Sequence, residues 1–253
     1  KKHQWKVFDI KVHFFSDNGS VYEVTAPEGT IDSTEKNEVM KLRLSKEVTT
    51  KSSSGYTFIS PDAEYVKESH ELLFPGNIQI TGPVKGPSDI LITGDQMTLN
   101  LKTNEITINK NVFARRRGSS EIMTLNSNQA ILNGITKVAV FKSNVRLKMS
   151  EFNIHSEVAT FHFNKNTLNS AILSDNLEVT SEDKKITAKK LIVDFKTKTF
   201  TFQGNSEFLS GGDSLSGDEL TISEDGRKIH VSNAKAVFNP NSKPKPIRPL
   251  KID

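Results

Sequence analysis

The sequence predicts an all-β protein in which antiparallel, turn-connected strands stack as repeats into two facing sheets. Three observations support this fold class. Apolar and polar residues alternate along many short segments, as they do in half-buried strands. No segment has apolar residues at the three- and four-residue spacing of a capped helix. One pattern also returns along the whole chain every 28 to 34 residues, which indicates stacked supersecondary units.

The clearest copy of this repeat lies at residues 186–205 and reads ITAKKLIVDFKTKTFTFQGN. It contains a small residue (Ala188), two alternating runs separated by a charged turn, and a closing asparagine (Asn205). The small residue returns as Ala26, Ser60, Gly94, Ser127, Ser156 and Gly217, and the asparagine returns as Asn77, Asn111, Asn144, Asn176 and Asn233. Because one repeat cannot bury its own apolar face, we expect seven of them to share one elongated, open-ended interior.

The individual elements follow from alternation and from turn residues. An opening strand over residues 5–15 ends at the turn Asp17-Asn18-Gly19. We then expect repeats that begin at Tyr22, Tyr56 and Ile90, that cover 123–147, 154–179 and 186–205, and that end with a shorter copy over 220–231. From Asn239 onward, four prolines within ten residues prevent sheet pairing, so the sequence predicts an extended tail.

The composition excludes several classes of protein. With 35% hydrophobic residues, 25% charged residues and a mean hydropathy of −0.44, the chain is not a membrane-spanning body. The absence of cysteine excludes disulfides, thiol catalysis and cysteine-based zinc sites. The net charge of +4 is a small excess spread over all repeats, and we therefore expect no nucleic-acid partner.

Three polar features could form binding sites. The repeated asparagine could bind a sugar or phosphate, but a left-handed turn position before a strand explains every copy. Arg115, Arg116 and Arg117 could contact the phosphates of a lipid headgroup, or they could form a solvated loop; no aromatic residues are interleaved with them for nucleic acid. His155 and His162 lie near each other in sequence without a ligand set, so we expect neither a metal nor another cofactor.

Catalysis requires a convergent set of groups, such as two carboxylates across a cleft. The acidic residues of this chain fall in turns between strands, and no pair of them can be placed together from the sequence. We therefore expect a protein that is not an enzyme.

At this point the repeat resembles the lipopolysaccharide-transport periplasmic proteins LptC and LptA (OstA-like). Residues 22–32 (YEVTAPEGTID) are similar to the opening motif of LptC. Residues 92–100 (ITGDQMTLN) and 186–194 are similar to the OstA-type unit, and Asn111-Val112, Asn144-Val145 and Gly204-Asn205 are similar to its closing element. The chain is several repeats longer than a typical LptC, so it looks like an LptC-type start that continues into LptA-type repeats.

The resemblance implies a V-shaped β-jellyroll, with residues 1–118 as an LptC-like part, 119–238 as LptA/OstA-like repeats of the same jellyroll, and 239–253 as the Pro-rich tail. It also implies a location in the periplasm, with an N-terminal helix that would precede Lys1 as an anchor in the inner membrane. The implied partners are lipopolysaccharide, the inner-membrane ABC transporter at the N-terminal end, and an LptA-like or outer-membrane Lpt protein that pairs with the C-terminal edge strand. Head-to-tail self-association would use the same edges.

The implied function is that of a lipid conduit, in which the apolar inward face forms a groove for acyl chains. The residues expected to line this groove are Leu99, Leu101, Ile106, Ile108, Leu125, Leu132, Val140, Phe161, Phe163, Leu191, Val193, Phe195, Phe200 and Phe202. Two alternatives remain. A structural or adhesive repeat protein would have a closed, dry core, and a carbohydrate-processing β-solenoid would need a carboxylate pair, for which Asp194, Asp218 and Glu219 are the candidates.

Overall fold

The computed structural model describes residues 3–34, 38–83, 89–118, 122–165, 167–182, 184–223 and 228–239. In these ranges the chain forms strands and turns and contains no helix, which confirms the all-β prediction. The chain divides into two compact units. The first contains Lys1–Arg116 and Asn128–Lys137, and the second contains Arg117–Ser127 and Val138–Asp253. The proposed tail from residue 240 onward lies outside the described residues.

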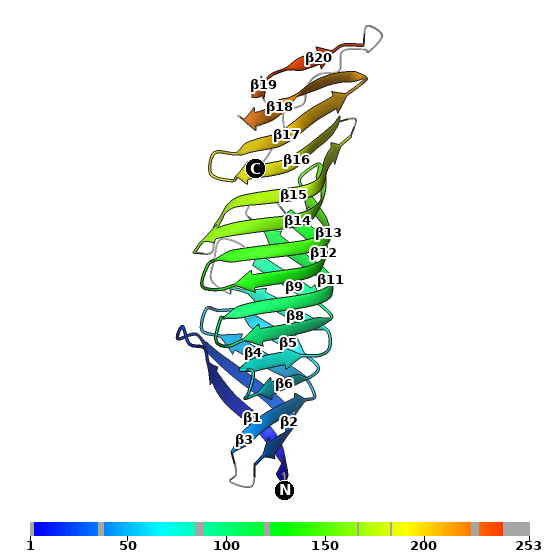
Figure 1. The fold of residues 1–253 in the computed structure, drawn as a ribbon. Helices are drawn as coiled ribbons and strands as arrows, with labels where there is room; N and C mark the ends of the chain where they lie inside the picture. Colours follow the sequence, from blue (N-terminus) through cyan, green and yellow to red (C-terminus); the bar gives the residue numbers. More distant parts are fainter. Residues whose placement is uncertain are drawn as a thin grey trace. The chain divides into compact units, whose positions relative to one another are not determined.

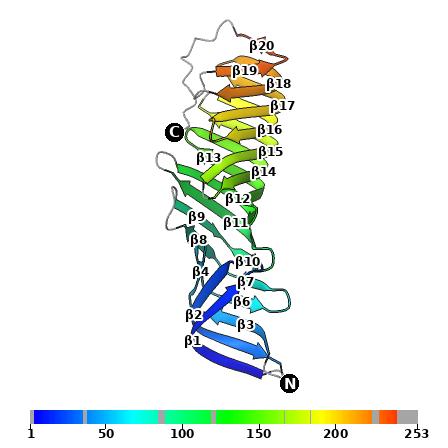
Figure 2. The ribbon, with the colours of Figure 1, turned by 90° about the vertical axis from the view of Figure 1, so that its left-hand side faces the viewer.

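The first unit begins with two long strands, β1 (His3–Phe15) and β2 (Val21–Ser33), which pair along their whole length. Eight shorter strands follow: β3 (Val39–Ser45), β4 (Val48–Ser52), β5 (Thr57–Ser60), β6 (Ala63–Val66), β7 (Glu71–Phe74), β8 (Ile78–Gly82), β9 (Asp89–Gly94) and β10 (Gln96–Asn100). The long strand β11 (Glu105–Arg117) comes next, and β12 (Ile122–Asn133) is divided between the two units. Figure 1 labels most of these strands, and Figure 2 adds β7 and β10.

Each pair of short strands in the first unit is one long strand that bends in its middle. The first half of β2 pairs with β4, and the antiparallel order continues through β5, β8 and β9. The second half of β2 pairs with β3, and the order continues through β6, β7, β10 and β11. Phe14 of β1 pairs with Tyr22 in the first half of β2, on the side of the first ladder. Its ring packs on Tyr65 of the second ladder, with centroids 4.6 Å apart, so the two ladders face each other.

The second unit is a regular antiparallel ladder of long strands. Its order is β13 (Val138–Met149), β14 (Phe152–Asn164), β15 (Thr167–Ser181), β16 (Lys184–Asp194), β17 (Thr199–Ser210) and β18 (Asp213–Ser223). The last rung consists of two short strands, β19 (Lys228–Ser232) and β20 (Lys235–Val237), which pair with the two halves of β18. Figure 2 shows these strands as successive rungs.

A bend in the middle of each strand explains the two repeated residues of the sequence. Asn111, Asn144, Asn176 and Asn205 have φ between 49° and 56°, and Lys110, Ser143, Asp175 and Gly204 before them also have positive φ. In the second unit, the strand register shifts at each such pair of residues: Ser143-Asn144, Asp175-Asn176 and Gly204-Asn205. Two left-handed residues in a row form a bulge that turns the strand, and asparagine and glycine adopt this conformation at low cost.

The prediction that the asparagine precedes a strand is therefore wrong for most copies. The left-handed conformation is present at five of the six repeated asparagines, including Asn233 between β19 and β20, but four of these five lie inside long strands. Asn77 does precede a strand, β8, and it is not among the residues with positive φ. The periodicity marked these asparagines, but alternation alone cannot distinguish a bulge within a strand from a turn between strands.

The repeated small residue lies on the neighbouring strand at the same bend. Ser60 and Ser156 are almost fully buried there, and each hydroxyl donates a hydrogen bond to the carbonyl two residues later, at 2.8 Å and 3.1 Å. At Gly94, a Cβ atom would lie only 2.3 Å from Cγ2 of Ile108. The two halves of the folded sheet converge at this line, so only small side chains fit there.

Candidate functional site

The inward face of the second unit carries two unbroken rows of apolar side chains. One row pairs Ala139, Phe161, Ala171, Val193, Phe200 and Ile222 across six strands, and the next pairs Phe141, Ala159, Leu173, Leu191, Phe202 and Leu220. All of these side chains are at most 9% exposed. Phe141 and Phe161 meet edge to face, with ring centroids 5.7 Å apart. The rows form one apolar surface that repeats at each strand.

The first unit has an equivalent inward face on its two ladders. Across one ladder the row is Val24, Thr50, Phe58, Ile80 and Ile92, and across the other it is Leu42, Tyr65, Leu72, Leu99 and Ile106. Thr50 is the polar exception: its hydroxyl is buried and has no hydrogen-bond partner among the residues that the structure describes. A buried hydroxyl without a partner lowers the free energy of unfolding by about 1–3 kcal/mol, so Thr50 stabilises the core less than an apolar side chain of the same size would.

The residues expected to line the groove lie on both units. In the first unit, Leu99, Leu101 and Ile108 are buried, and Ile106 and Leu132 are half-buried. In the second unit, Leu125, Phe161, Leu191, Val193, Phe200 and Phe202 are buried, and Val140, Phe163 and Phe195 are half-buried. Four further residues share rows with these but were not among the predicted lining residues: Phe141, Leu173, Leu220 and Ile222.

Three of the half-buried residues have local explanations. Val140 alternates with the buried Ala139 and Phe141 and pairs with Thr160, so it lies on the outward face of β13. Phe195 follows the last residue of β16, and its backbone N–H donates to the carbonyl of Asn169 at 3.1 Å. Phe163 lies at a register shift between β14 and β15.

The three consecutive arginines belong to strand β11 rather than to a loop. Arg115 is about one-third exposed, and its Nη2 lies 3.7 Å from Oδ2 of Asp89 at the start of β9. Its Nε is buried and has no hydrogen-bond partner within the described part of the chain. The Asp89 carboxylate is more than half exposed, so this ion pair is weak and leaves the guanidinium with donors that an anion could use.

The carboxylates proposed for a hydrolytic site all have structural partners. Asp194 Oδ1 accepts hydrogen bonds from the backbone N–H groups of Lys196 and Thr197, at 2.8 Å and 2.9 Å. The hydrogen bond from the backbone N–H of Thr197 holds the pKa of Asp194 below its usual value. Asp218 accepts a hydrogen bond from Asn233, and Glu219 accepts one from Gln203 at 2.9 Å. These carboxylates stabilise turns, bends and strand pairs.

Other classes of site are not found in the described ranges. Among those residues, no group of three or more histidine, aspartate or glutamate side chains could hold a metal ion. His155 and His162 lie on β14 and pair with Arg146 and Val138 of β13. In the same part of the chain, no helix is long and apolar enough to cross a membrane.

Comparison with known proteins adds two family matches. Residues 44–169 match a model described as "Lipopolysaccharide-assembly, LptC-related", and residues 124–228 match one described as "LptA/(LptD N-terminal domain) LPS transport protein". No curated protein matches the chain. A solved structure of LptH from Pseudomonas aeruginosa, described as the LptA homologous periplasmic component of a lipopolysaccharide transport device, is 10% identical; the match covers 47% of this chain and 95% of that chain, with a TM-score of 0.43.

Proposed function

Because the chain belongs to the lipopolysaccharide-transport family represented by the LptC and LptA/LptD models, we propose that it is a non-catalytic lipid conduit of the periplasm. In this proposal the inward rows bind the acyl chains of lipopolysaccharide. The protein passes the lipid from the inner-membrane ABC transporter towards the outer membrane.

The observation that supports this proposal best is the repetition of the inward rows from strand to strand. Transfer of acyl chains from water gains about 0.8 kcal/mol per methylene, so a lipid would not leave such a surface into water at a useful rate. Movement from one strand to the next exchanges one apolar environment for an equivalent one and has little net cost. Directed transfer then needs a motor outside this chain.

The strands at the ends of the chain are the proposed sites of partner contact. β1 pairs only with β2, and β19 and β20 pair only with β18, within the part of the chain that the structure describes. Their free edges can accept a strand from another protein. We assign the transporter to the β1 edge and an LptA-like or outer-membrane partner to the β19/β20 edge, with residues 1–118 as the LptC-like part and 119–238 as the LptA-like part. An N-terminal anchor in the inner membrane belongs to the same proposal.

The arginines at the end of β11 have a place in this proposal. Arg115, Arg116 and Arg117 would contact the phosphates of the headgroup, since guanidinium groups bind phosphate with paired hydrogen bonds. The weak ion pair between Arg115 and the exposed Asp89 supports this role, because it leaves guanidinium donors for an anion.

A structural protein with a closed core is the second candidate. The deep burial of the inward rows favours it, because Leu173, Leu191 and Leu220 have no exposed surface and Phe161 has only 4%. In a closed core these side chains would only hold the sheet halves together. The two candidates differ in whether lipid reaches the inward face.

A photo-crosslinking experiment separates them. A photoreactive residue replaces Phe161 or Val193, which point inward, or their sequence neighbours Thr160 and Ile192, which lie in the outward row. In cells that make lipopolysaccharide, we expect adducts with the glycolipid from the inward pair only. Thermal unfolding of each variant controls for folding. Folded variants without adducts at 161 and 193, or with equal adducts on both faces, would exclude the conduit.

A further inference from the structure

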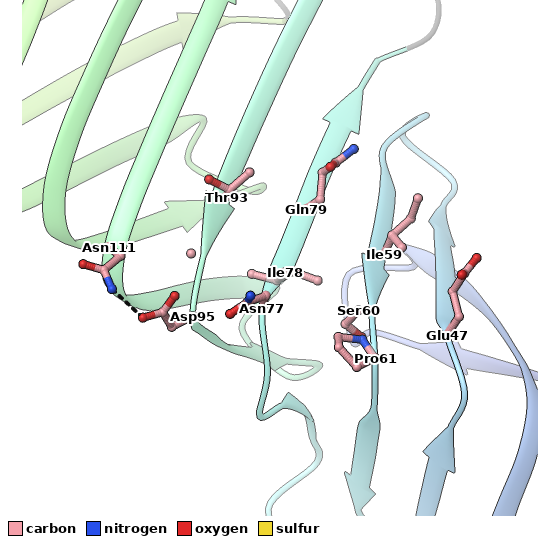
Figure 3. Close-up of a pocket in the computed structure, with 11 residues that line it drawn as sticks. Glu47, Ile59, Ser60, Pro61, Asn77, Ile78, Gln79, Thr93, Asp95 and Asn111 are labelled. Atoms are coloured by element: carbon pink, nitrogen blue, oxygen red, sulfur yellow. Dashed lines mark hydrogen bonds between the residues drawn. The ribbon is translucent and has the colours of Figure 1, made fainter.

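An open cavity of about 630 Å³, with both polar and apolar residues in its lining, lies in the first unit beside the bend of its strands. Figure 3 shows the residues that surround it. Ligand sites typically have volumes of about 300–1,000 Å³, so the cavity is large enough for a small molecule or for part of a chain-like one. Neither the conduit nor the closed-core candidate uses it.

The cavity lies on the face of the sheet that is opposite to the apolar interior. Ile59, Gln79 and Thr93 pair across β5, β8 and β9 and form its wall. Their strand neighbours Phe58, Ile80 and Ile92 are buried on the inward face. A sheet therefore separates the cavity from the inward rows, and one bound acyl chain cannot occupy both.

The walls of the cavity carry polar groups that both donate and accept hydrogen bonds. The side chains of Asn77, Gln79 and Thr93 form no hydrogen bond with any described residue. Asn111 donates to Oδ2 of Asp95 at 2.6 Å, which fixes this pair at the side of the cavity and leaves other oxygens to accept (Figure 3). Ile59, 38% exposed, adds an apolar surface to the same wall.

The charge of the cavity restricts the ligand. Glu47 and Asp95 contribute carboxylates, and no lysine, arginine or histidine is among the described residues that line it. Phosphate groups would be repelled. The amide and hydroxyl side chains of the lining both donate and accept hydrogen bonds, as sugar hydroxyls do.

We propose that this cavity, here called the bend cavity, binds a neutral glycan. Sugar hydroxyls would hydrogen-bond to Asn77, Gln79, Thr93 and the Asp95–Asn111 pair, and an apolar face of a sugar ring would pack on Ile59. The proposal goes beyond lipid transport and does not depend on it.

A second cavity of this unit differs from the first because its charged groups already form ion pairs. It has a volume of about 370 Å³, and its lining includes Glu28, Arg43 and Glu64. These groups are already paired: Glu28 with Lys46 at 2.6 Å, and Glu64 with Arg43 at 3.1 Å and with Lys41 at 2.7 Å. A ligand there would have to replace existing ion pairs, so we assign the glycan only to the bend cavity.

Saturation-transfer NMR on the full chain tests the proposal with two neutral glycans. One is the oligosaccharide released from lipopolysaccharide by mild acid and then dephosphorylated, and the other is chitohexaose, which has no lipid source. We expect at least one of them to receive saturation from the wild-type protein. The glycan that binds identifies the source. The double variant Gln79→Met/Thr93→Val preserves strand pairing and size, and it should weaken binding at least fivefold.

The matched control is Thr160→Val, which removes a hydroxyl from a half-buried outward position of β14. Its glycan binding should equal that of the wild type. The proposal is overturned if neither glycan binds, if the double variant binds as well as the wild type, or if trilysine displaces the glycan and this displacement requires Glu47. Crosslinking of lipid at Val193 is measured on the same double variant, so loss of the glycan site and failure of the conduit are distinguishable.

Discussion

Gly94 is a residue at which the bend of the sheet is sensitive to side-chain size. A Cβ atom there would lie 2.3 Å from Cγ2 of Ile108, whose side chain is completely buried. We expect Gly94→Ala to lower the free energy of unfolding by about 1–3 kcal/mol, which is typical of an overpacked core. Urea denaturation monitored by circular dichroism measures this change.

Gly76→Ala is the control for this substitution. Its added Cβ would meet only Pro61, at the ordinary contact distance of 3.5 Å. We expect a change within about 0.5 kcal/mol, or a slight stabilisation because alanine restricts the unfolded chain. Equal losses at both glycines would show that the close contact at Gly94 does not determine the packing of the bend.

Tyr22 should make the stability of the protein sensitive to alkaline pH. The side chain is 4% exposed, its hydroxyl donates to Asn104, and burial raises its pKa to about 12. Below the unfolded-state pKa of about 10 the phenol is neutral in both states, so its contribution is fully present. Between pH 10 and 12 the Tyr22 phenol ionises only in the unfolded chain, and the free energy of unfolding therefore falls by about 1.4 kcal/mol per pH unit.

Denaturant titrations between pH 8 and 12 test this dependence on Tyr22→Phe as well as on the wild type. The variant loses the hydrogen bond to Asn104, and so it should be less stable at pH 8. Above pH 10, the gap between the two proteins should shrink, because phenylalanine does not ionise. A constant gap over the whole range would mean that the Tyr22 hydroxyl is accessible to water in the folded protein.

At the scale of the strand, the bulge asparagines act through their backbone conformation. Asn176 has φ of 54°, and its exposed side chain makes no hydrogen bond with a described residue. We expect Asn176→Gly to leave stability nearly unchanged, because glycine adopts this conformation freely. Asn176→Val should cost about 1–2 kcal/mol, since a branched side chain disfavours left-handed backbone. Thermal and urea unfolding measure both effects.

Asn169→Val is the matched control, at an exposed position of β15 without positive φ. It should have little effect or stabilise the strand slightly, because valine favours extended backbone. If Asn176→Gly retained stability but abolished lipid crosslinking at Val193, the Asn176 side chain would bind the lipid. The explanation of this asparagine by its left-handed backbone alone would then be wrong.

The strands were predictable from sequence to the extent that their alternation is unambiguous. Leu191 and Val193 are flanked by residues of mixed polarity, and the prediction placed them on the buried side, where they lie. Residues 138–141 (VAVF) are all apolar, so their pattern does not say which two face inward. Ala139 and Phe141 are buried in the structure, whereas Val140, which was predicted to line the groove, lies on the outward face.

The bends were less predictable than the strands for a physical reason. Where β14 turns, the buried positions change from Ile154 and Ser156 to Ala159 and Phe161, so the two-residue period slips by one residue. A period-two reading continues through such a slip and assigns one half of the strand to the wrong face. The small residue and the asparagine mark the slip, but their meaning requires the pairing of neighbouring strands, which the sequence does not contain. The bend cavity is formed by the same bends and was missed for the same reason.

At the scale of the whole molecule, β1 and β20 carry exposed apolar residues beside edges that pair with no further described strand. On β1, Trp5, Phe8 and Phe15 are 55–68% exposed, and after β20, Phe238 is 76% exposed. Large exposed apolar residues beside a free strand edge are unusual in a monomer that avoids association. These strands therefore favour the proposal that copies of the chain, or related chains, join through their edges.

The edge at β19 and β20 provides a direct test of self-association. Val237 and Phe238 are 55% and 76% exposed, and Val237→Lys/Phe238→Ser places charge and polarity beside the free edge. In sedimentation velocity over a concentration series, we expect the wild type to form larger species as concentration rises, because a head-to-tail contact does not close on itself. The double variant should remain monomeric over the same range.

Ile135→Lys changes a residue of similar exposure, 52%, in the turn after β12 and should associate like the wild type. If the wild type remained monomeric at every concentration, the β19/β20 edge would not bind the β1 edge of another copy, and strand addition would be restricted to other proteins. If Ile135→Lys also abolished association, net charge rather than the strand edge would control it.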